Sequence, residues 1–70
     1  MRLGRMNAKT GRIEYARIQS VSWIPSQVNP WCFKWMDSKE DGTHFDSDVA
    51  NQIRFVLSNK YHEQIILFEV

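Results

Sequence analysis

The sequence predicts an α+β fold: a small antiparallel-rich sheet of four to five strands with one helix packed on it, in the approximate order β-β-β-β-α-β. Three observations predict this class. Short runs rich in β-branched and aromatic residues are separated by turn signals. One later segment carries apolar residues at helical spacing. A chain of 70 residues is also short enough that we read residues 1–70 as a single domain.

The first two predicted strands are joined by the turn NAKTG (7–11), whose glycine can adopt a positive φ. This turn connects a short strand near Leu3–Met6 to a longer strand over 12–24. In the longer strand, Ile13 and Tyr15 share one parity, Ala16 and Ile18 take the other, and Val21 and Trp23 return to the first. This slip predicts a bulge near Tyr15–Ala16.

The clearest strand signal is WCFKWM (31–36), in which Trp31, Phe33 and Trp35 alternate with smaller or charged residues. A strict period of two is typical of a strand, so we expect the three aromatic side chains to share one face. A proline-containing loop precedes this run and the turn SKEDG follows it. Thr43–Phe45 is then expected to return as a short strand.

The helix is predicted from Asp48 to Asn59, with Asp46 or Ser47 as its N-cap. At 100° per residue, its apolar side chains form a stripe about 120° wide. The stripe consists of Val49, Ala50, Ile53, Val56 and Leu57.

The last predicted strand, QIILFEV (64–70), is apolar on both faces, as is the strand over 31–36. Strands of this kind usually lie inside a sheet that is covered on both sides. A single helix covers only one face. The second apolar face must therefore close on itself, as in a small barrel, or be covered by another chain.

Charge is distributed unevenly along the chain, although the net charge is only +1. Residues 1–36 hold six basic residues and one acid, whereas residues 37–48 hold five acids and one lysine. This polarity favours a charged partner, unless folding brings the two segments together into a mixed surface.

The single cysteine, Cys32, excludes an internal disulfide and favours a reducing compartment, so we expect a cytoplasmic protein. The basic N-terminal segment lacks the apolar region of a signal peptide. The longest aliphatic and aromatic run, IILF, is far shorter than the roughly 20 residues of a membrane span, so no membrane partner is expected.

The acidic segment DSKEDGTHFDSD resembles a calcium-binding EF-hand loop only in part. Asp37, Asp41, Gly42 and Asp48 match four loop positions, but Lys39 stands where the third ligand should be. The residues before the segment also read as a strand where that motif needs a helix. We therefore expect no metal site and no cofactor.

No nucleophile elbow or glycine-rich phosphate loop accompanies the serine, cysteine or histidine residues, so we expect no enzymatic activity and no catalytic residues. The leading hypothesis is a non-enzymatic protein-interaction module. It would act as a small inhibitor or adaptor, of the kind that phages and mobile elements encode, and dock on a larger partner. The alternatives are a nucleic-acid-binding module with an aromatic and basic sheet face and the subunit of a homodimer.

The candidate partner-binding residues are aromatic or basic, and Phe55 lies off the apolar stripe of the helix. They are Trp23, Trp31, Trp35, Phe55, Arg12, Arg17 and Lys34. The competing interpretation is that most of the nine aromatic residues form the core, because a domain of this size has few other large apolar side chains.

Overall fold

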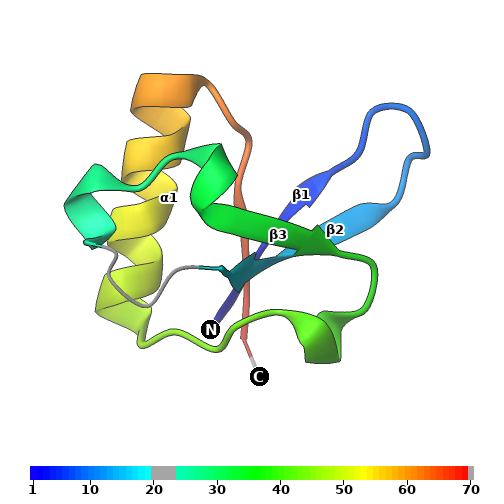
Figure 1. Cartoon of the computed structure of the whole chain (residues 1–70), viewed down its shortest axis with the longest axis horizontal. Coiled ribbons are helices and arrows are strands. Elements are labelled where there is room, and N and C mark those ends of the chain that lie inside the picture. The colour runs from blue at the N-terminus through cyan, green and yellow to red at the C-terminus, as the bar shows by residue number, and fades with distance from the viewer. Residues whose placement is uncertain (20–23, 70) are drawn as a thin grey trace.

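A computed structural model describes residues 1–19 and 24–69 and confirms the α+β class. Within these ranges, four strands form one antiparallel sheet in the order β3-β2-β1-β4, and one α-helix lies on it (Figure 1). The elements are β1 (Arg2–Met6), β2 (Ile13–Ile18), β3 (Phe33–Met36), α1 (Ser47–Tyr61) and β4 (Ile66–Phe68).

The predicted turn joins β1 and β2 into a hairpin that projects from the rest of the molecule (Figure 1). The Asn7 side chain accepts hydrogen bonds from the backbone N–H groups of Lys9 at 2.9 Å and Thr10 at 3.4 Å. Gly11 has φ +70°, in the left-handed region that favours glycine. These local bonds set the turn, and the turn sets the register that pairs Met6 with Ile13.

The predicted bulge in β2 is wrong. Each residue from Tyr15 to Ile18 pairs with β3 in consecutive register. The change of parity has another cause: Ile13 and Tyr15 lie on the sheet face away from α1, and Ala16 lies on the face toward it. β2 carries apolar side chains on both faces, so its apolar residues change parity although the backbone pairing is regular.

The aromatic strand begins two residues later than predicted. Pro30 opens a short 3₁₀ helix, η2 (Pro30–Cys32), and the Asn29 side chain accepts a hydrogen bond from the Trp31 N–H at 2.9 Å. A proline at the first helical position and an asparagine before it favour such a turn. Trp31 therefore leaves the sheet, and only Phe33 and Trp35 share a strand face as predicted.

The strand expected at Thr43–Phe45 is not formed. This segment is an extended link in which the Thr43 N–H donates to the Ala16 carbonyl at 2.9 Å and the Phe45 N–H donates to the Met1 carbonyl at 2.7 Å. The Ile18 N–H also donates to the Thr43 hydroxyl, and the Met1 amino group donates to the Phe45 carbonyl, so the segment is bonded both to β2 and to the residue before β1.

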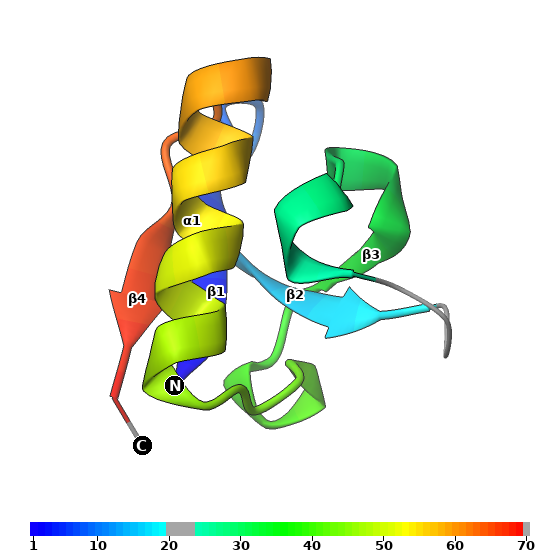
Figure 2. The ribbon, with the colours of Figure 1, turned by 90° about the vertical axis from the view of Figure 1, so that its left-hand side faces the viewer.

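The predicted helix is confirmed and extends to Tyr61. Asp46 is the N-cap residue, as expected, and α1 lies along one face of the sheet (Figure 2). The centre of its apolar stripe, Ala50, Ile53 and Leu57, is buried. We call this side of the sheet the inner face.

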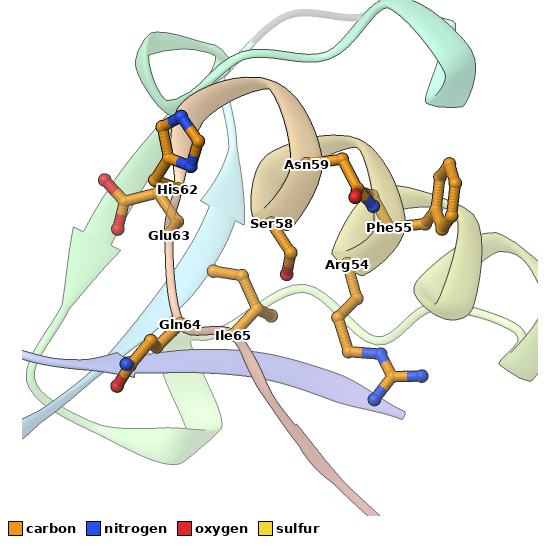
Figure 3. A pocket seen from close by; sticks show the side chains of 8 residues that line it. All are labelled: Arg54, Phe55, Ser58, Asn59, His62, Glu63, Gln64 and Ile65. Carbon is orange, nitrogen blue, oxygen red and sulfur yellow. The ribbon is translucent and has the colours of Figure 1, made fainter.

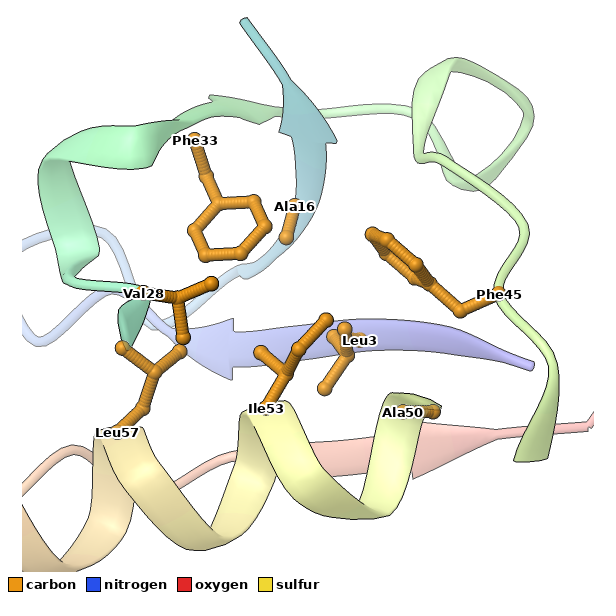
Figure 4. Packing of buried hydrophobic residues seen from close by; sticks show 8 residues of the cluster. All are labelled: Leu3, Ala16, Val28, Phe33, Phe45, Ala50, Ile53 and Leu57. Carbon is orange, nitrogen blue, oxygen red and sulfur yellow. The ribbon is translucent and has the colours of Figure 1, made fainter. Parts of the chain in front are cut away.

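The core lies between α1 and the inner face (Figure 4). Phe45 and Val28 close it from the connecting segments, Val28 from the link between η1 (Pro25–Gln27) and η2. The buried hydrophobic residues of the described ranges are Leu3, Ala16, Val28, Phe33, Phe45, Ala50, Ile53 and Leu57.

The position predicted for the last strand is also wrong. β4 is a three-residue edge strand that pairs only with β1 among the described strands, not an interior strand. Both faces of β4 are apolar because each packs against a different part of the molecule. Leu67 packs against the core, and Phe68 packs against Tyr15 on the other face, with ring centroids 5.3 Å apart.

The end of α1 offers a stability test. His62 caps the helix with φ 56°, and its N–H donates to the Leu57 carbonyl. Left-handed geometry is unfavourable for a residue with a Cβ, so His62→Gly should raise the free energy of unfolding by about 0.5–1 kcal/mol. Lys60→Gly, inside the helix, should lower it by about as much. Urea denaturation measures both, and destabilisation by both variants would contradict this explanation.

Candidate interaction surfaces

The sheet face opposite α1, which we call the outer face, carries a cluster of apolar side chains. None of them is fully buried, and no α-helix lies against them in the described part of the chain (Figure 2). Met6 is 62% exposed and Ile66 is 40% exposed. The apolar side chains of the outer face are Met6, Ile13, Tyr15, Met36, Ile66 and Phe68.

Gly4 makes the centre of the outer face compact. A Cβ at this position would lie 2.6 Å from Phe68 Cε2 and 3.1 Å from Ile13 Cγ2. The absence of a side chain lets the Phe68 ring lie over the β1 backbone and meet Tyr15 beyond it. At the rim, Lys39 of the short helix η3 (Lys39–Asp41) places its ammonium 5.9 Å from the Phe68 ring centroid.

Two of the predicted basic residues lie together beside this apolar cluster. Arg17 in β2 is directly opposite Lys34 in β3, and both side chains are exposed. Arg12 is also exposed but precedes β2, at the hairpin. The register of the sheet thus unites two residues that lie 17 positions apart in the sequence.

Two of the predicted tryptophans line the same cleft on the other side of the sheet, which has a volume of about 380 Å³ and which we call the aromatic cleft. Trp31 is 78% exposed and stands nearly perpendicular to Tyr61, with ring centroids 6.0 Å apart. The Trp35 indole N–H donates to the Pro30 carbonyl at 3.2 Å. The main side chains of this cleft are Arg5, Trp31, Trp35, Tyr61 and Glu63.

Arg5, which sequence reasoning missed, occupies the cleft from within. Its guanidinium carbon lies 4.0 Å from the Trp35 ring centroid. Its nitrogens also lie 3.5 Å from a Glu14 carboxylate oxygen and 3.3 Å from one of Glu63. A cation already held by a ring and two carboxylates stabilises the molecule and leaves the Trp35 face unavailable to a ligand. Its only signal in the sequence is a parity shared with Leu3, which places it on the inner face.

Phe55 belongs to neither of these surfaces. It is 68% exposed on α1, at the rim of a mainly polar hollow of about 640 Å³ (Figure 3). The side chains of Ser58 and Ile65 lie toward the middle of the hollow, whereas Phe55 points away from it. The hollow is lined by Arg54, Phe55, Ser58, Asn59, His62, Glu63, Gln64 and Ile65.

The remaining candidate, Trp23, lies outside the described residues. Within residues 1–19 and 24–69, no group of three or more histidine, cysteine, aspartate or glutamate side chains could hold a metal ion. No helix in the same ranges has the length and apolar character to cross a membrane.

Comparisons with models of protein families, with curated proteins and with solved structures found no match to this chain. The placement of its side chains is therefore the basis for any functional proposal.

Proposed function

We propose that this chain is a non-enzymatic protein-interaction module that docks on a different, larger protein through the outer face of its sheet. The observation that carries the proposal is the apolar outer face, which no α-helix covers in the described part of the chain. The cytoplasm suits such a module, since Cys32 is a free thiol.

Apolar area explains why this face favours a partner. Apolar surface that remains in water forgoes about 25 cal/mol per Å² of stabilisation, and a small domain has little to spare. The six apolar side chains of the outer face are distributed over all four strands, and Tyr15 is paired with Met36 and contacts Phe68. Contiguous patches of this kind usually mark interfaces, whereas scattered exposed residues such as Phe55 do not need a partner.

A nucleic-acid partner is the second candidate, favoured by the exposed basic pair of Arg17 and Lys34. The aromatic rings argue against it. Tyr15 and Phe68 pack against each other, and Lys39 lies over the Phe68 ring, so part of the ring surface on which a base could stack is already occupied. The most exposed apolar side chains on this face are aliphatic, which suits a protein surface better.

Substitution of the two most exposed outer-face residues tests the proposal. Met6→Ser with Ile66→Ser should weaken binding at least about tenfold, because apolar contacts at the centre of an interface carry most of the affinity. Both side chains are already partly solvated, so the fold should persist. The wild-type chain, immobilised as bait in extract of the encoding organism, supplies the partner, and its affinity for each variant is then measured.

Phe55→Ser is the matched control, because it removes a comparably exposed apolar side chain from α1. It should leave the affinity unchanged. If Phe55→Ser abolishes binding and the double variant does not, docking occurs on the helix and the proposal is wrong.

A further inference from the structure

We propose that the partner presents an acidic surface, and that Arg17 and Lys34 bind its carboxylates at the edge of the outer face. This inference rests on the proposed docking function and adds the chemistry of the partner.

The placement of Arg17 and Lys34 is unfavourable in the isolated chain. Residues directly opposite each other on antiparallel strands have Cβ atoms about 4.5–5.5 Å apart, and like charges in such a pair repel. Their side chains project from the same face. Neither forms an ion pair with another described residue. An anion supplied from outside would remove this repulsion.

A second cross-strand pair of the same sheet shows the opposite arrangement. On the inner face, Arg5 is directly opposite Glu14, and the two form an ion pair at 3.5 Å. The sheet therefore provides a counter-charge for Arg5 of β1. It provides none for the two exposed cations of β2 and β3.

One acid near the outer face, Glu40, interacts with other cations. Glu40 lies in η3, and the Ser38 hydroxyl, which donates a hydrogen bond to it, is the main cause that lowers the pKa of its carboxyl. Arg2 and Lys39 add smaller favourable charge interactions. The acidic helix η3 thus balances the Arg2 end of the sheet, and the pair in β2 and β3 remains without a counter-charge among the described residues.

A second copy of the chain suits this surface poorly. In a two-fold symmetric dimer the same patch meets itself, and the strand residues on this face include no acid that could pair with Arg17 or Lys34. Carboxylates on a different chain would instead meet Arg17 and Lys34 while apolar side chains cover Met36 and Tyr15. The fitting partner therefore combines acidic and apolar residues on one surface, as in a strand that carries them two positions apart.

The defined probe is a short peptide with aspartate and valine two positions apart and serine between them, so that both lie on one face of an extended chain. It is titrated into the isotope-labelled protein and followed by amide NMR shifts. We expect shifts at Tyr15, Arg17, Lys34 and Met36, and an affinity that falls as sodium chloride rises from about 0.05 to 0.5 M. R17Q/K34Q should weaken binding at least about tenfold. R54Q/K60Q is the matched control, because it removes two exposed charges from α1 and should change nothing.

Three outcomes would overturn the inference. Equal binding of a peptide with asparagine in place of aspartate would show that charge has no part in recognition. Tighter binding of a short oligothymidine at Arg17 and Lys34 would indicate a nucleic-acid partner. Concentration-dependent sedimentation of the purified chain, abolished by R17Q/K34Q, would make the acidic partner another copy.

The two proposals fail separately. If the partner captured by the bait still binds R17Q/K34Q but loses the Met6 and Ile66 double variant, docking stands and the acidic chemistry falls. If it binds both variants as tightly as wild type, the outer face is not the docking surface and both proposals fall.

Discussion

Replacement of Phe33 by alanine is expected to lower the free energy of unfolding by about 3–5 kcal/mol, because it removes a large side chain and leaves a cavity in the core. Phe33 is 3% exposed. Its ring centroid lies 6.0 Å from that of Trp35 and 6.5 Å from that of Phe45, and it fills the space between β3 and the helix (Figure 4). A domain of about 70 residues has roughly 4–10 kcal/mol in total, so this loss should leave the variant largely or partly unfolded.

Trp31→Ala is the matched control for Phe33→Ala. The sequence places both residues in one alternating run, but Trp31 lies in η2, is 78% exposed, and has its ring nearly perpendicular to that of Tyr61. Its replacement should cost less than about 1 kcal/mol. Urea denaturation measures both variants, and equal losses would mean that the two aromatic residues share one environment, contrary to the structure.

Gly4→Ala is expected to destabilise the fold by about 1–3 kcal/mol, although alanine is a small residue. The new methyl group would meet Phe68 Cε2 at 2.6 Å, Ile13 Cγ2 at 3.1 Å and the Glu14 carbonyl oxygen at 3.2 Å. The Phe68 ring is the end of a side chain and can move, but the β2 backbone oxygen cannot move without disturbing the hairpin. Displacement of the ring would also open the outer face.

A double-mutant cycle separates this clash from a general effect of alanine in β1. Phe68→Ala removes the nearest atom, so the cost of Gly4→Ala should fall substantially in that background. Chemical denaturation of the four proteins gives the coupling energy. Strictly additive losses would mean that Phe68 does not lie over Gly4.

Local signals predicted the helix and the hairpin because their determinants lie close together in sequence. The stripe around Ile53 needs only helical periodicity, and the first turn needs only the Asn7 side chain and Gly11. Trp31 was wrongly placed in the strand because the 3₁₀ helix that begins at Pro30 does not interrupt the alternating pattern of the sequence. Periodicity alone cannot show where such a run leaves the sheet.

The candidate surfaces depend on the order and register of strands, which local patterns do not encode. The apolar character of the last strand suggested an interior position, whereas β4 is at an edge and its second face joins the outer face. Arg17 and Lys34 were each predicted to bind a partner, but their adjacency follows only from the pairing of β2 with β3. The sequence predicted that one helix leaves an apolar sheet face uncovered, and the outer face is that face in the described structure.

Carbene footprinting can measure directly whether a partner covers the outer face. The chain is labelled once in purified form and once in extract of the encoding organism. Docking on the outer face predicts that Met6 and Ile66 are labelled strongly in the purified chain and protected in the extract, because both are exposed in the isolated fold. Phe55 and Trp31 should be labelled alike in both conditions. Equal labelling of Met6 and Ile66 in both conditions, with protection of Phe55 or Trp31 in the extract, would contradict docking through the outer face.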